Sequence, residues 1–303
     1  MRSIKLTPIV LFAYKRIDKV KTCLESLEKC KDADKTNLII FCDGYKGETD
    51  KQNVLEVQNY IRIYSQNKHS FCNVYPFFKE KNHGLANSIV SGVTKVMQEY
   101  GSAIIVEDDL IVSGDFIQYM NAALKYYKDD KRVGTIGAFT PISNKIQMSP
   151  GGVLKSRMGC CWGWATWYDR WKNIDWNIDH CLPLTEEEQK SIDRVQYGFC
   201  AMLKQQAEGK IDSWAVRYDY YSIKNDLWTI YPNKSKVASV GFDSSSTHAK
   251  DKHDKRKKVT AEEDAIYMTR LEDVIDVSIP MRAYFKPGII EKIRYFFVMR
   301  RYR

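Results

Sequence analysis

The sequence predicts an α/β fold in which a mostly parallel sheet is flanked by helices. Over the first 110 residues, short apolar runs alternate with stretches of helical spacing, which is the pattern of consecutive strand–helix–strand units. Three acidic residues at positions 107–109 directly follow the fourth apolar run. Right-handed crossovers place the carboxyl ends of parallel strands at one edge, where open sheets bind ligands. We therefore expect a polar site at that edge.

Each element has its own signal in the sequence. The predicted strands of the first half are apolar runs at positions 8–13, 38–42, 73–78 and 103–106. The predicted helices carry apolar residues three or four positions apart, at positions 17–30, 54–63 and 85–97, and a further helix begins at Phe116. The second half is less regular, with predicted strands at 133–139 and 237–241, a predicted helix at 185–206, and five tryptophans between 162 and 176.

The composition excludes several classes of protein. A hydrophobic content of 44% and a charged content of 28% are typical of a soluble globular protein, and no run approaches the roughly 18–20 apolar residues of a spanning helix. The net charge of +9 lies in two segments: residues 250–258 hold six Lys/Arg and two Asp, and residues 286–303 hold six Lys/Arg and one Glu. So local an excess argues against a nucleic-acid-binding face and favours contact with anionic lipid or phosphate.

The cysteines and the two ends of the chain bear on location. The eight cysteines form neither CxxC pairs nor a zinc pattern, so we expect a reducing cytoplasm. The first apolar run lacks a cleavage site and is read as a strand, not a signal peptide. The tail, residues 286–303, interleaves apolar and basic residues like an interfacial helix on the inner face of the cell membrane. A terminal helix packed on the core, with its basic face in solvent, is the alternative.

The acidic triplet Glu107-Asp108-Asp109 is the strongest candidate site. Clustered carboxylates are unfavourable unless a cation offsets them, and oxygen ligands suit Mg²⁺ or Mn²⁺. We interpret the triplet as the site of a divalent metal that holds a nucleotide's phosphates, and a solvated acidic turn is the alternative. Polar residues that follow the other strands should meet it there, namely Tyr14, Arg16, Asp43, His83, Gly84 and Asn87. Gly84 opens a helix whose amino terminus favours phosphate, and no GxGxxG or Walker A loop occurs.

Several motifs, taken in order, resemble the GT-A glycosyltransferases. The nearest branches are the bacterial family 2 sugar transferases and the N-acetylglucosaminyltransferase I type, which shares the Glu-Asp-Asp form of the metal motif. The resemblance covers about residues 5–250. It is carried by Thr7-Pro8-Ile9-Val10 with Arg16, Asp43-Gly44, Asn82-His83-Gly84-Leu85-Ala86, Glu107-Asp108-Asp109-Leu110, Trp162-Gly163-Trp164-Ala165-Thr166-Trp167, Asp212-Ser213-Trp214, and Gly241-Phe242-Asp243 with Thr247-His248.

This resemblance implies a GT-A, Rossmann-like fold with a small antiparallel acceptor-side portion. One domain would cover residues 1–285, with a nucleotide-binding half at 1–110, an acceptor-side half at 111–285, and a separate tail at 286–303. The metal, Mn²⁺ or Mg²⁺, would be bound by Asp109 and, in some relatives, by a histidine at the position of His248. The nucleotide sugar would contact Pro8, Tyr14, Arg16, Asp43, His83, Gly84, Asn87, Glu107, Asp108, Trp162 and Trp164.

The resemblance also implies a catalytic base. Inverting transfer needs a carboxylate that takes the proton from the acceptor hydroxyl, and Asp212 matches the family position. A helix cap is the alternative role for Asp212, and Asp219 and Asp179 are the fallback bases. Of the five clustered tryptophans we expect about two near the sugar and the others in the core, because large aromatic residues serve both purposes.

The expected activity is transfer of a sugar from a nucleotide diphosphate to a saccharide hydroxyl, in polysaccharide or glycan biosynthesis. UDP is the favoured nucleotide and N-acetylglucosamine the favoured sugar, and a lipid-linked acceptor would suit a membrane-associated enzyme. A sugar-nucleotide nucleotidyltransferase is one alternative, although residues 13–18 lack the glycine-rich loop such enzymes carry. A non-catalytic carbohydrate-binding protein of the same fold is the other.

Overall fold

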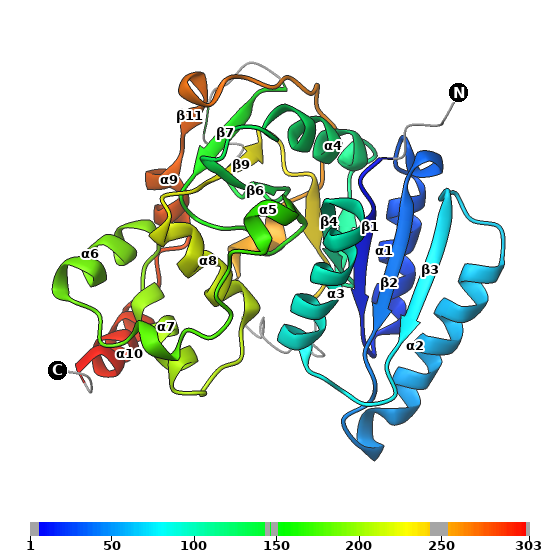
Figure 1. Ribbon diagram of the computed structural model, residues 1–303, viewed down its shortest axis with the longest axis horizontal. Coiled ribbons are helices and arrows are strands. Elements are labelled where there is room, and N and C mark those ends of the chain that lie inside the picture. Colours follow the sequence, from blue (N-terminus) through cyan, green and yellow to red (C-terminus); the bar gives the residue numbers. More distant parts are fainter. Residues whose placement is uncertain (1–5, 143–145, 147–150, 243–253, 301–303) are drawn as a thin grey trace.

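A single large sheet runs through both halves of the chain. The computed structural model describes residues 6–142, 146, 151–242 and 254–300. Within these ranges a nine-stranded sheet has the strand order β11-β7-β9-β6-β8-β4-β1-β2-β3 (Figure 1). The predicted α/β architecture is confirmed.

The first half forms the parallel part of this sheet. Its strands are β1 (Ile9–Ala13), β2 (Asn37–Cys42), β3 (Asn73–Phe78) and β4 (Ser102–Glu107). Its helices are α1 (Ile17–Glu28), α2 (Glu48–Gln66) and α3 (Leu85–Tyr100). β1 pairs in parallel with both β2 and β4, and Phe12 of β1 lies opposite Glu107 of β4. The carboxyl ends of these strands therefore lie at one edge.

Helices cover both faces because residues of the central strands alternate between two apolar clusters. Ile9 and Leu11 pack with residues of α1, α2 and α4 (Phe116–Tyr126). Val10 and Phe12 pack with residues of α3, α5 (Tyr168–Trp171) and α8 (Trp214–Lys224). Successive side chains of a strand point to opposite faces, so a fully apolar strand such as β1 must be covered on both. Figure 1 shows α3 and α1 on opposite sides of β1 and β4.

The second half adds both antiparallel and parallel pairs. Its strands in the large sheet are β6 (Val133–Gly137), β7 (Val153–Ser156), β8 (Trp164–Trp167), β9 (Trp228–Pro232) and β11 (Ile275–Asp276). β8 runs antiparallel to both β4 and β6, and β7 runs antiparallel to β9. β6 is parallel to β9, and β11 is parallel to β7. A separate antiparallel pair joins β5 (Leu110–Val112) to β10 (Val237–Ser239). The expected antiparallel portion is confirmed.

One predicted helix is in fact two. Instead of a single helix over 185–206, the chain forms α6 (Glu186–Val195) and α7 (Phe199–Ala207). The break lies where Gln196 is extended and Gly198 adopts a φ of 72°, a left-handed conformation that favours glycine. Thr185 begins α6 by accepting a hydrogen bond from the Glu188 amide, as an N-cap does. The predicted strand at 237–241 ends at Ser239.

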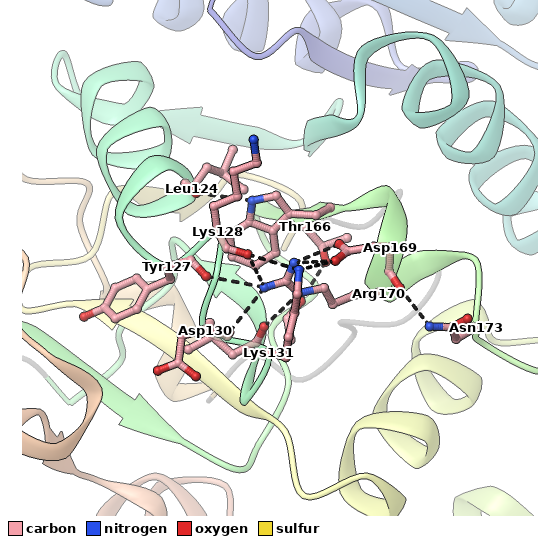
Figure 2. A network of polar contacts seen from close by, with 12 residues as sticks. Leu124, Tyr127, Lys128, Asp130, Lys131, Thr166, Asp169, Arg170 and Asn173 are labelled. Carbon is pink, nitrogen blue, oxygen red and sulfur yellow. Dashed lines mark hydrogen bonds and ion pairs between the residues drawn. The ribbon is translucent and has the colours of Figure 1, made fainter.

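A buried arginine joins the helices at the edge opposite the acidic triplet. Arg170 is 5% exposed and donates to the carbonyls of Lys128 at 2.7 Å and Asp130 at 3.2 Å, where the chain leaves α4 (Figure 2). It also pairs with Asp169 at 2.8 Å and lies over the Trp167 ring. Trp167 lies opposite the first residue of β4, so this network supports the scaffold far from the triplet.

The remaining elements complete the described chain. Short 3₁₀ helices occur at Ala33–Lys35, Asp179–Cys181, Lys255–Lys258 and Leu271–Asp273. The chain ends in α9 (Ser278–Tyr284) and α10 (Ile289–Arg300). Among the helices of the described residues, none combines the length and apolar character needed to cross a bilayer.

Candidate functional site

The acidic triplet meets the turn after β1, as predicted. Nη2 of Arg16 donates to Asp108 at 2.7 Å and to Asp109 at 3.0 Å. The backbone amide of Tyr14 donates to the second oxygen of Asp108 at 3.2 Å. One guanidinium and one amide thus hold two of the three carboxylates at the carboxyl edge of the sheet.

Burial raises the pKa of two carboxyl groups in this cluster. Desolvation, followed by the charges of Asp109 and Asp108, raises the pKa of Glu107 to about 8. Desolvation also raises the pKa of Asp108 to about 6, although Arg16 opposes that shift. Arg16 therefore neutralises only part of the negative charge of the three carboxylates, and an additional cation would be favourable there.

Asp109 has a different environment from its neighbours. Its side chain is 23% exposed, against 7% for Asp108, and its carboxylate rests against Gly241. An alanine Cβ at position 241 would lie 2.8 Å from Cγ of Asp109, closer than side chains normally approach. The Asp109 carbonyl accepts from the Val240 amide at 2.8 Å. The pairing of β5 with β10 thus places Val240 and Gly241 beside Asp109.

Asp43 is nearly buried and supports the turn before α3. Its carboxylate accepts from the backbone amides of His83 at 3.0 Å and Gly84 at 3.1 Å, and from Gly44 at 3.1 Å. With this many donors, the carboxylate has little capacity left for a ligand. Asp43 is therefore a positioning residue, which sets the amino terminus of α3 beside the triplet.

Other polar side chains tighten the same edge. The Tyr14 hydroxyl donates to Asp50 in the first turn of α2, and burial and then Asp50 raise the pKa of Tyr14. The Asn87 side chain donates to the His83 carbonyl at 3.0 Å. His83 and Asn87 are both exposed, so their remaining polar atoms are available to a ligand.

Two predicted site residues are misplaced. Pro8 precedes β1 and its carbonyl accepts from the Ile104 amide, so it lies at the amino end of the strands. Pro8 lies four positions before Phe12, which is opposite Glu107, and four steps span about 13 Å at the rise of a strand. Trp164 is 0% exposed and stacks on Trp214 at 4.9 Å. It belongs to the core and has no surface for a sugar.

Trp162 is the tryptophan that reaches the site. Its ring packs edge-on against Phe242, with centroids 5.6 Å apart, and Phe242 follows the glycine that touches Asp109. The guanidinium of Arg256 lies 4.9 Å from the Trp162 centroid, and Asp254 binds its Nε and Nη2. The packing of Gly241 against Asp109 was not predicted from the sequence. The basic run at 250–258 was the only signal for Arg256.

The candidate bases have unequal environments. Asp212 precedes α8, is 55% exposed and pairs with Arg217 at 2.7 Å. Asp219, on α8, faces Gly159, where an added Cβ would lie 2.6 Å from its Cγ. Burial raises the pKa of Asp219 to about 7. The side chain of Asp179 and the whole of His248 lie outside the described residues.

The donor set fits a hard divalent cation. Within the described ranges, no three His, Cys, Asp or Glu side chains are arranged as a metal cage. Mg²⁺ is usually bound by one or two carboxylates together with substrate phosphates and waters, so a full cage is not required. Asp109, partly exposed and next to a buried carboxylate with a raised pKa, is the residue best placed to bind such an ion.

Comparisons with known proteins bear on the family of the chain. Residues 2–178 match the model of the GNT-I family, which is more than half of the 303 residues. No curated protein matches the sequence.

Three solved structures show how far structural likeness extends. S. aureus TarS is 13% identical over 44% of this chain and 21% of its own, at a TM-score of 0.31. A TarS fragment, residues 1–349, is 11% identical over 75% of this chain and 60% of its own, at a TM-score of 0.39. GalNAc-T7, solved with UDP, GalNAc and Mn²⁺, is 11% identical over 78% of this chain and 44% of its own, at a TM-score of 0.47. The chain spans less than half of TarS and of GalNAc-T7, and likeness at these TM-scores carries no argument about the site.

Proposed function

We propose, since this chain belongs to the GNT-I family of glycosyltransferases, that it transfers a sugar from a nucleotide-diphosphate donor to a saccharide hydroxyl with inversion. The observation that carries the proposal is the triplet Glu107-Asp108-Asp109 at the carboxyl edge of β4. Burial raises the pKa values of Glu107 and Asp108, and a bound cation would stabilise their ionised forms. UDP is the proposed nucleotide and N-acetylglucosamine the proposed sugar, both from the family resemblance.

The residues divide the work by position. A divalent cation bound at Asp109 would neutralise charge on the departing diphosphate. Tyr14, Arg16, His83 and Asn87 surround the same edge and are proposed to contact the nucleotide. Arg256 is proposed to bind the diphosphate. Asp254 occupies its Nε and Nη2, and among the described residues no acidic group binds Nη1. Trp162 is proposed to pack against the donor sugar.

Asp212 is the proposed base, because it matches the family position and lies just before α8, which packs against α3. A specific observation favours Asp219 as a second candidate. No hydrogen bond or ion pair holds its carboxylate within the described chain. Burial raises the pKa of Asp219 to about 7, which suits proton transfer at neutral pH. The two variants D212N and D219N should both keep donor binding, and only the variant that lacks the base should lose transfer by about 100-fold or more. Normal turnover in D212N would remove Asp212.

The finer part of the proposal concerns the acceptor. We propose a saccharide that is lipid-linked, used by an enzyme that works on the cytoplasmic face of a membrane. Support comes from exposed side chains of α10, three apolar ones and Lys292, which are described below as a surface in their own right.

Thermal-shift screening of sugar nucleotides with and without Mn²⁺ tests the proposal. A ligand that binds only the native state at 100 times its Kd stabilises by about 2.7 kcal/mol, so the true donor should give the largest rise in Tm and only with metal. D109A should lose this rise, and D129A, which removes an exposed aspartate on a remote loop, should keep it. An equal rise in D109A and wild type would refute the metal assignment.

A further inference from the structure

The last helix, α10, is attached to the body of the protein by one face. It packs against α7, and Figure 1 shows the two helices together at the periphery of the molecule. The Tyr295 ring lies directly over Gly198: an added Cβ at 198 would be 2.6 Å from Cδ2 and 2.8 Å from Cζ of the tyrosine. The absence of a side chain at Gly198 thus allows Tyr295 of α10 to pack there.

A second face of α10 is apolar and turned to solvent. Ile289, Ile293 and Phe297 are 78%, 50% and 56% exposed. They are spaced four residues apart, so they form one stripe along the helix. Lys292 on the same helix is exposed, and so is Lys286, three residues before the helix begins. A helix that only packed on the core would turn such residues inward, and these three side chains are not turned inward.

We infer that the stripe Ile289-Ile293-Phe297 binds the surface of an anionic membrane. Isolated exposed apolar residues are ordinary. An apolar stripe on a twelve-residue helix, with one exposed lysine on the helix and another just before it, has the composition of an interfacial helix. Such a helix is about 18 Å long at 1.5 Å per residue, too short to span, so it would lie in the plane of the headgroups. The lysines would meet anionic lipids.

Charge decides between a membrane and a second copy of the chain. Residues 286–303 hold six Lys/Arg and one Glu, so two such tails placed face to face would repel, whereas an anionic surface attracts each of them. The surface also does not depend on the donor site, because α10 contacts α7 and the acidic triplet lies at the carboxyl end of β4.

The test is co-sedimentation of the full chain with vesicles of 30% phosphatidylglycerol in phosphatidylcholine, and with phosphatidylcholine alone. Wild type should partition to the anionic vesicles. I293S/F297S should lower the partition coefficient by more than about tenfold, and K286Q/K292Q should lower it by about fivefold for each lysine. The matched control is L55S/I63S, which removes two equally exposed apolar residues from α2 and should bind like wild type.

The possible outcomes separate the inference from its rivals. Equal partitioning of wild type and I293S/F297S would overturn it, as would equal binding to neutral and anionic vesicles. Sedimentation of wild type as a dimer that I293S/F297S abolishes, without vesicle binding, would assign the stripe to a second copy instead. All variants should retain metal-dependent nucleotide binding. Failure of the vesicle experiment would therefore not contradict the proposed sugar transfer, and failure of nucleotide binding would not contradict the membrane surface.

Discussion

Gly241→Ala should damage metal binding while leaving the fold intact. An added Cβ would lie 2.8 Å from Cγ and 3.1 Å from Cβ of Asp109, and closer still to Oδ2. Ordinary contacts of a Cβ begin at 3.4 Å, so the carboxylate must move by on the order of 1 Å. The φ of Gly241 lies outside the left-handed region, so alanine introduces no backbone strain. The entire effect should therefore pass through the Asp109 carboxylate.

The size of the effect follows from this displacement. Misplacing a group by about 1 Å at a reaction centre is worth on the order of 100-fold, so the affinity for UDP in Mn²⁺ should fall by about 10- to 100-fold. Asp109 is partly exposed and can turn toward solvent, so the free energy of unfolding without metal should change by less than about 1 kcal/mol.

Isothermal titration of UDP with and without Mn²⁺, together with urea unfolding in EDTA, measures both quantities. Gly288→Ala is the matched control, because nothing lies within 4 Å of a Cβ there, and it should behave like wild type in both assays. Unchanged Mn²⁺-dependent affinity in Gly241→Ala would refute the placement of the metal at Asp109. A large loss of stability without metal would show that position 241 serves the fold and not the site.

Two further predictions concern the electrostatics and the scaffold. Glu107 and Asp108 have folded-state pKa values of about 8 and about 6, above their ordinary values, so the native protein binds more protons than the unfolded chain as pH rises from about 4 to 8, and its stability in EDTA should decline across that window. Mn²⁺ requires the deprotonated carboxylates, so the rise in Tm that it causes should grow from pH 5.5 to 8.5, and an equal rise at both would contradict this account. Arg170→Met should lower the free energy of unfolding by about 1–3 kcal/mol, because the carbonyls of Lys128 and Asp130 lose their donor. It should leave nucleotide affinity unchanged, and an unchanged urea midpoint would count against that network.

The parts of the site that depend on strand order were predictable from the sequence. Arg16 and Asp108 lie directly after apolar runs, and parallel pairing of those runs brings them to 2.7 Å. Asp43 was placed at the correct edge, but its role was not foreseen, because a carboxylate that binds backbone amides looks the same in sequence as one that binds a ligand. Pro8 failed for a simpler reason: a motif at the start of a strand lies at the wrong end of it.

The sequence of the second half contains no local pattern that predicts its long-range contacts. Gly241 reaches Asp109 because β10 pairs with β5 across more than a hundred residues, and a two-strand antiparallel pair has no local pattern that names its partner. Trp164 and Trp162 differ by two positions, yet one is in the core and the other at the site. That distinction depends on Trp214 and Tyr218, which stack on Trp164 from α8.

Arg16 explains how the fold tolerates three consecutive carboxylates and still leaves room for a cation. When all are ionised, Arg16 offsets only one of the three charges. It lies against Asp108, which is nearly buried and also held by the Tyr14 amide, so the guanidinium mainly stabilises the inner carboxylate. Asp109 is the more exposed of its two partners and the longer contact, at 3.0 Å. A dication at Asp109 therefore need not displace Arg16 from Asp108, because the arginine neutralises the buried charge and the exposed carboxylate remains for the ligand.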